Sequence, residues 1–162
     1  MLYTCVYGYT NYFSQEAQDE HVKKVFNDLT VQTGQSEDTP KFRIVESDTI
    51  NAYTNGKDVV IFRGMLNFVK NDDELAMVLS HELAHVMLRH TSFSEFQITS
   101  LETSQAEANA DKLGAIYMIK SGYDVCKARD LWMRMLKTKG NYQGNDHPTY
   151  SYRFDELNIN CE

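Results

Sequence analysis

The stretch VLSHELAHVMLRH, residues 78–90, contains two histidines four positions apart with a glutamate directly after the first. On an α-helix, positions i and i+4 lie on one face one turn apart, so His81 and His85 can direct their rings at a single point. Glu82 lies about 100° further around the helix, within reach of a water at that point. The stretch therefore predicts a helix that carries a tetrahedral zinc site together with its base.

A simpler interpretation of the same pattern is an amphipathic helix. Leu75, Leu79, Leu83 and Val86 would then face the core, and the histidines would lie at its boundary. The pattern His-Glu-x-x-His arises by chance in roughly one in a hundred sequences of this length and composition. What separates the two interpretations is a third protein ligand, which a catalytic zinc ion requires beside an open fourth position.

One source of a third ligand is a later histidine, as in His-Glu-x-x-His-x-x-Gly-x-x-His. Leu88 and Thr91 occupy the glycine and histidine positions of that pattern, so this route is closed. His90 lies five residues after His85, and we expect it to point away from the ligand face as a surface or helix C-terminal histidine. The remaining source is a carboxylate from a second helix.

The segment QAEANADKLGA, residues 105–115, offers Glu107 and, one turn later, Asp111. If the chain turns near residues 91–98 and returns as an antiparallel helix, Glu107 arrives level with His85. Its small neighbours, Gly114 among them, would let the helices pack closely, and Asp111 could accept the free ring N–H of a ligating histidine. The alternative for both acidic residues is a solvated helix face.

Composition limits the classes of protein that fit. The 162 residues, 42% of them hydrophobic, suffice for one compact domain over residues 1–162, with residues 1–14 as an N-terminal extension. A net charge of -7 without any Lys/Arg run argues against nucleic-acid binding. No window approaches the roughly 18 apolar residues of a membrane span. We therefore expect a soluble periplasmic or cytoplasmic protein, whose association with a membrane would need a partner or a removed anchor.

The three cysteines form no Cys-x-x-Cys pair, which disfavours a cysteine zinc site. Cys126 could pair with Cys161 in an oxidising compartment, whereas in the cytosol both, like Cys5, would stay reduced. The sequence leaves these alternatives open.

Hydrophobic periodicity and turn residues predict an α+β fold that is mostly helical, with a small, mostly antiparallel sheet next to the metal-binding helix. The expected helices cover residues 15–33, 72–90, 97–120 and 125–140 with a short one after Pro148, and the expected strands cover 42–46, 50–54 and 58–62 around the turn Asn55-Gly56.

Four segments, taken in order, resemble the gluzincin metallopeptidases of family forty-eight, which include the HtpX and CAAX prenyl proteases, the Oma-type mitochondrial proteases and their periplasmic relatives. The segments are INAYTNGKDVVIFRGML (50–66), DDELAMVLSHELAHVMLRH (72–90), EANADKLGAIYMIKSGYD (107–124) and DHPTYSYRF (146–154). The resemblance covers roughly residues 41–155. Many members carry transmembrane helices or a long insertion after the metal helix, so this chain resembles the bare catalytic core.

The resemblance implies a zincin-like fold and a set of site residues. One Zn²⁺ per chain would be held by His81, His85 and Glu107. Asp111 would contact a ligating histidine without binding the ion. The Asn-Ala strand of the family falls on Asn51, Ala52 and Tyr53, which would form the edge along which the substrate backbone pairs.

The implied activity is that of a zinc-dependent metalloendopeptidase acting on extended or unfolded protein segments. Glu82 would take a proton from the zinc-activated water and return it to the leaving amine. His147 and Arg153, from the His-Pro-x4-Arg element, are candidates for a second oxyanion donor. They could instead be a turn residue and a surface charge, or His147 could swing onto the metal and block it.

Two rival functions fit the same sequence. One is a catalytically inactive or self-blocked zinc-binding adaptor or chaperone module of the same fold. The other is a protease dedicated to a single regulatory protein.

Overall fold

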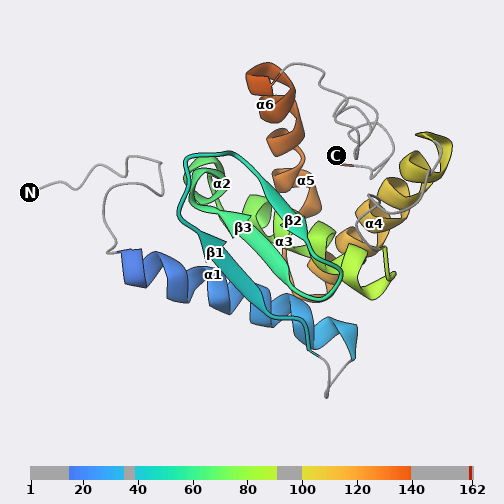
Figure 1. Cartoon of the computed structure of the whole chain (residues 1–162), viewed down its shortest axis with the longest axis horizontal. Coiled ribbons are helices and arrows are strands. Elements are labelled where there is room, and N and C mark those ends of the chain that lie inside the picture. The colour runs from blue at the N-terminus through green and yellow to red at the C-terminus, as the bar shows by residue number, and fades with distance from the viewer. Residues whose placement is uncertain (1–14, 35–38, 91–99, 140–160, 162) are drawn as a thin grey trace, which may run out of the picture.

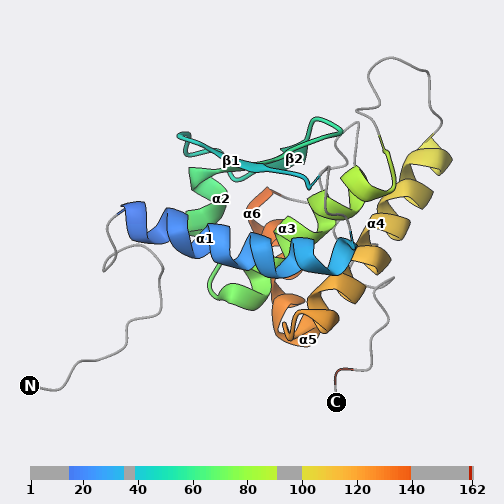
Figure 2. The same cartoon turned by 90° about the horizontal axis from the view of Figure 1, so that it is seen from below.

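The fold is given by a computed structural model, which describes residues 15–34, 39–90, 100–139 and 161 (Figure 1). In chain order the elements are α1 (Gln15–Thr30), the 3-10 helix η1 (Val31–Thr33), β1 (Phe42–Val45), β2 (Ala52–Thr54), β3 (Val59–Phe62), α2 (Arg63–Phe68), α3 (Asp72–Met87), α4 (Ser100–Lys120), α5 (Val125–Ala128) and α6 (Asp130–Lys139). The sheet forms one layer and the helices lie against it, with α3 in the middle (Figure 2). The predicted α+β, zincin-like fold is confirmed. Single-domain organisation remains a prediction, and residues 1–14 and the helix expected after Pro148 lie outside the described residues.

The sheet has the strand order β1-β3-β2. β3 runs antiparallel to β2, with Ala52 opposite Ile61, but parallel to β1, with Phe42 opposite Val59. The sheet is therefore mixed rather than mostly antiparallel, because β1 joins the far side of β3 instead of extending the β2–β3 hairpin. Val59, Val60 and Ile61 of β3 point alternately to the two faces of the sheet and are all buried, so the strand is covered on both faces and its apolar run need not alternate.

Helix α3 is the centre of the molecule. Every residue of the segment 74–85 is buried, and α3 packs against α1, α4, α5 and the sheet. A helix covered all round is expected to be apolar all round. The buried polar side chains His81, Glu82 and His85 are therefore exceptions that require partners or a function.

The first turn of α3 is fixed by a cap and a buried ion pair. The Asn71 side chain accepts a hydrogen bond from the backbone N–H of Glu74, which is half of the predicted capping box. The Glu74 carboxylate does not reach back to Asn71. Instead it accepts from the backbone N–H of Lys70 and pairs with the Arg134 guanidinium, which joins α3 to α6. Glu74 is only 2% exposed, so Arg134 supplies the counter-charge that its burial requires.

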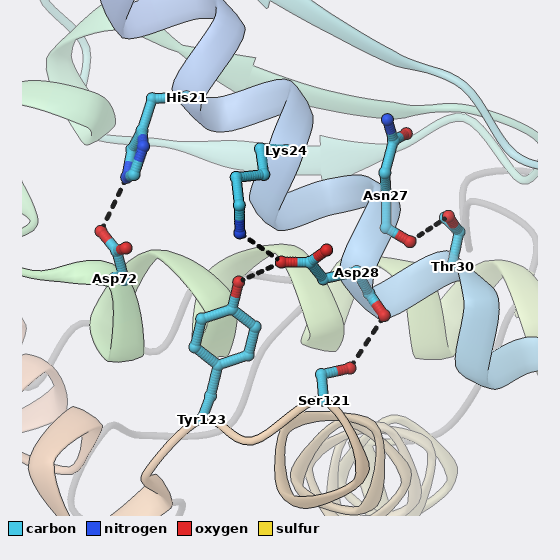
Figure 3. Close-up of polar contacts among 8 residues, drawn as sticks. All are labelled: His21, Lys24, Asn27, Asp28, Thr30, Asp72, Ser121 and Tyr123. Atoms are coloured by element: carbon cyan, nitrogen blue, oxygen red, sulfur yellow. Dashed lines mark hydrogen bonds and ion pairs between the residues drawn. The ribbon is translucent and has the colours of Figure 1, made fainter.

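Polar contacts fasten α1 across α3 and the turn that follows α4 (Figure 3). His21 pairs with Asp72 at 2.8 Å, and Asp28 accepts a hydrogen bond from the Tyr123 hydroxyl at 3.0 Å. The Ser121 hydroxyl donates to the backbone carbonyl of Asp28. The first contact joins α1 to the start of α3, and the other two join α1 to the turn after α4.

A disulfide joins Cys126 in α5 to Cys161 near the C-terminus, with the two Cα atoms 5.5 Å apart. This resolves the alternatives left open by the sequence in favour of pairing.

Within the described ranges, none of the helices combines the length and apolarity that a membrane span requires.

Replacing both Cys126 and Cys161 with serine is expected to lower the free energy of unfolding by about 2–5 kcal/mol, because the cross-link restricts the unfolded chain. The two cysteines are 35 residues apart in the sequence, and a cross-link that closes a loop of this length is expected to have an effect in that range rather than near zero. Urea unfolding with and without reductant measures it. As a control, reductant should lower the urea midpoint of the wild type and leave that of the double variant unchanged. Equal midpoints for the wild type and the double variant would contradict the prediction.

Candidate metal centre

His81, His85 and Glu107 bring three ligand atoms together inside the protein. The Nε2 atoms of the two histidines are 3.0 Å apart. Glu107 Oε2 lies 3.3 Å from Nε2 of His81, and Glu107 Oε1 lies 3.1 Å from Nε2 of His85. The histidines are each 4% exposed and the glutamate is fully buried. The three side chains therefore form a closed triangle of donor atoms that could hold one metal ion.

The triangle exists because α3 and α4 pack antiparallel. Along α4, Glu107 contacts His81 and His85, Asp111 contacts His81, and Gly114 lies against Ser80. Residue numbers therefore rise along α4 while they fall along α3, as they do in an antiparallel pair of helices. A Cβ at position 114 would lie 3.1 Å from the Ser80 carbonyl carbon and 3.2 Å from the His81 backbone nitrogen. Gly114 thus permits the close approach that lets a short carboxylate side chain reach both histidines.

Replacing Gly114 with alanine is expected to push α4 away from α3 by a few tenths of an ångström. The contact is with backbone atoms, so the cost should be about 1–3 kcal/mol of stability, as for other overpacked sites. Affinity for zinc should fall as well, because the same shift moves Glu107. Thermal unfolding and chelator competition measure the two effects. Ala108→Gly, a change of the same size on the same helix, should lower stability without the displacement, and an unchanged zinc affinity in the Gly114 variant would contradict the prediction.

Asp111 and Trp132 fix the orientation of the His81 ring. Its Nδ1 lies 2.9 Å from Oδ1 of Asp111, and Trp132 stands edge-on to its ring with the centroids 6.4 Å apart. An ionised carboxylate can only accept, so Nδ1 of His81 carries the proton and Nε2 presents its lone pair to the triangle. A cavity of about 10 Å³ behind the ring leaves room for at most about one water.

His90 corrects a prediction. It does not point away from the ligands, since its Nδ1 lies 3.0 Å from Nδ1 of His85. The prediction assumed that the helix continues to residue 90, whereas α3 ends at Met87 and the chain turns back at Arg89, whose φ is 56°. Burial and the neighbouring His85 lower the pKa of His90, which favours a neutral ring. A glycine at position 89 would have signalled this turn, but the sequence has none there.

The donor set fits a divalent cation. With His81 Nδ1 protonated, three electron-rich atoms face one another at 3.0–3.3 Å in a buried space. Ligand atoms about 2.05 Å from an ion at the tetrahedral angle are separated by about 3.3 Å, close to the distances seen. Two imidazole nitrogens and one carboxylate oxygen form a ligand set that catalytic zinc sites use.

The other predicted site residues are placed as follows. Glu82 follows His81 on α3 and is 6% exposed. Asn51 precedes β2, and its carbonyl accepts from the backbone N–H of Phe62, while Ala52 is buried and Tyr53 is 41% exposed on β2. β2 packs against α3, which places this strand beside the metal helix. The structure thus brings the three predicted ligands, His81, His85 and Glu107, and Asp111 together. His147 and Arg153 lie outside the described residues.

The site has the ligand set of zinc peptidases such as thermolysin, in which two histidines and a glutamate hold the ion. The comparison of sequences agrees. The profile described as Peptidase family M48 matches residues 16–106, over half of the 162 residues, and the chain belongs to this family. A profile described as Peptidase U49 matches residues 74–161.

Curated relatives include proteins named as peptidases. The chain is 27% identical to a mitochondrial metalloendopeptidase OMA1 of Schizosaccharomyces pombe, over 74% of this chain and 44% of the relative. It is 30% identical to a protease HtpX homolog of Desulfatibacillum aliphaticivorans, over 66% of this chain and 41% of the relative. The chain therefore spans less than half of the length of these relatives.

Proposed function

We propose that the protein is a zinc-dependent metalloendopeptidase that hydrolyses peptide bonds in extended or unfolded protein segments. The observation that carries the proposal is the convergence of His81, His85 and Glu107 within 3.0–3.3 Å of one another. Glu82 is the residue that follows His81 on α3, and it is buried. Membership of peptidase family M48 supports the same class of reaction.

In this proposal the residues have separate tasks. His81, His85 and Glu107 hold the ion, and Asp111 keeps the proton of His81 on Nδ1. A Zn²⁺ ion bound by these residues would lower the pKa of water toward neutrality and would polarise a carbonyl oxygen. Glu82 accepts the proton of the attacking water and returns it to the leaving amine. His147 and Arg153 remain candidate donors to the oxyanion.

β2 is the proposed docking edge for substrate, because its backbone is available for pairing. Phe62 donates its N–H to Asn51, so residues 51 and 62 form a hydrogen-bonded pair across the ladder. Such pairs alternate along an antiparallel ladder, so the next pair, Ala52 and Ile61, is not hydrogen-bonded. The N–H and C=O of Ala52 therefore point away from β3, and no other described strand pairs with that side. An extended peptide added there would lie alongside the metal helix.

The disulfide indicates the kind of cellular compartment in which the protein would act. Disulfides persist in oxidising compartments and are rare in the cytosol, so the Cys126–Cys161 bond favours a compartment such as the periplasm. Substrates would then be extracytoplasmic proteins that have unfolded or that contain flexible segments.

Metal analysis combined with a cleavage assay tests the proposal. Purified protein should contain about one zinc per chain, as a three-ligand site with one open position implies. It should cleave an unstructured protein such as casein, lose that activity with chelator and regain it when zinc is returned. Bound zinc without cleavage would favour the inactive adaptor module, and cleavage of one regulatory protein alone would favour the dedicated protease. Cleavage that persists after complete zinc removal would refute the proposal.

A further inference from the structure

The chain makes an unusual turn as it leaves α3. The backbone N–H of His90 bonds to the His85 carbonyl at 2.9 Å, and that of Arg89 bonds to the Val86 carbonyl at 3.1 Å. These two bonds define a Schellman motif, in which the residue after the cap is left-handed and usually glycine. Here that residue is Arg89, with φ of 56°. A residue with a side chain adopts this conformation at a cost of about 1 kcal/mol or more, so the surrounding structure must enforce it.

The turn has one evident result, which is to lay His90 against His85. The ring centroids are 5.1 Å apart with the planes at 64°, and the two Nδ1 atoms are separated by 3.0 Å. Nε2 of His85 already faces His81 and Glu107. The two nitrogens of the His85 ring are therefore both engaged, one by the triangle of ligands and the other by His90.

The positions of the protons follow once His85 is taken as a metal ligand through Nε2. A histidine that ligates through Nε2 has its lone pair there and its proton on Nδ1. Nδ1–H of His85 then donates to Nδ1 of His90, which accepts as a neutral ring with its own proton on Nε2. Asp111 does the corresponding task for His81. The two ligands thus have different acceptors, a carboxylate for one and an imidazole for the other.

A neutral acceptor also suits the charges of the site. Glu107 and Asp111 already contact the two histidines, and Glu82 is buried next to His81 in the sequence, so the site of one divalent ion would already have three carboxyl groups in or next to it. A fourth carboxylate behind His85 would add negative charge without solvent to screen it. An imidazole fixes the ring of His85 without adding charge.

We propose that His90, held by the left-handed turn at Arg89, is a positioning residue that sets the tautomer and ring orientation of the metal ligand His85. The inference rests on the proposed zinc site and adds His90 to the side chains outside the ligand set, which already include Glu82 and Asp111. In this proposal His90 acts through its contact with His85 and not by binding the ion or the substrate.

The test measures the zinc dissociation constant by chelator competition, together with thermal unfolding of the metal-free protein. His90→Phe keeps a ring of similar size but removes the acceptor, and it should weaken zinc binding about 10–100-fold, as loss of such partners does elsewhere. His90→Asn places an amide oxygen near the position of Nδ1 and should restore affinity to within a few-fold of wild type. His21→Phe is the matched control, since His21 is half-buried and hydrogen-bonded in α1, and it should not change zinc affinity.

A second pair of variants tests the turn with His90 intact. Arg89→Gly relieves the left-handed residue and should leave zinc affinity unchanged, whereas Arg89→Val opposes that conformation and should weaken it. Zinc affinity unchanged in His90→Phe, or lowered equally in His90→Phe and His90→Asn, would overturn the inference. Failure of the wild type to bind zinc would instead overturn the proposed function, so the two failures are distinguishable.

Discussion

Replacing Glu82 with glutamine is expected to lower kcat/KM for an unstructured protein by about 10²–10⁴-fold, the usual contribution of a general base. The amide has the size of the carboxylate but cannot accept a proton. Zinc content should stay at the wild-type level, because Glu82 does not belong to the group of side chains that could hold the ion, His81, His85 and Glu107. A loss of this size with the metal retained would show that Glu82 acts as the base and not as a metal ligand.

The measurement combines steady-state cleavage of casein with metal analysis of the same preparation. Glu20→Gln is the matched control, since Glu20 is an exposed glutamate on α1, and it should cleave at the wild-type rate. A Glu82→Gln variant that keeps more than a tenth of wild-type activity would rule out Glu82 as the base. A variant that loses both zinc and activity would show that position 82 acts in metal binding.

The second large effect is expected at Glu107. Loss of a residue that hydrogen-bonds to a metal ligand typically weakens metal binding about 10–100-fold. Glu107→Gln should weaken zinc binding by more than this, because it replaces the anionic ligand of the set with a neutral one. Zinc should then no longer raise the melting temperature, since stabilisation by a ligand depends on its concentration relative to its dissociation constant. Metal-free stability should change little, because glutamine has the size of glutamate and its amide can still hydrogen-bond to His81 and His85.

Chelator competition and thermal unfolding with and without zinc measure these changes. Glu20→Gln serves again as the control with the same chemical change at an exposed position. A Glu107→Gln variant that binds zinc as tightly as wild type would place the third ligand elsewhere. In that case the contact of Glu107 with the histidines would be an ion-pair network of the apoprotein alone.

The parts of the structure that the sequence predicted are those that local spacing controls. The i, i+4 placement of His81 and His85 depends only on helix geometry, and the return of Glu107 depends on the length of chain between two helices. Both could be derived without tertiary information, and the structure places the three residues together. Gly114 was recognised as a small residue of the helix pair, and its close contact with Ser80 has the packing role expected of it.

The parts that were missed depend on interactions between distant segments. The parallel pairing of β1 with β3 is a choice among partners that no local pattern reveals. Helix α2, only six residues long, is too short to show a periodicity. The reversal at Arg89 lacks the glycine that normally marks it, so tertiary packing around His85 and His90 overrides the local preference. His147 and Arg153 stay predictions.

The Cys126–Cys161 bond affects how any cutting of the chain by itself would be detected. A single break anywhere between these two cysteines leaves both pieces covalently joined, so a nicked molecule keeps its full mass and migrates as intact on a gel without reductant. Autolysis in that stretch would become visible only after thiol treatment. Preparations that look homogeneous under non-reducing electrophoresis can therefore contain a mixture of whole and clipped chains.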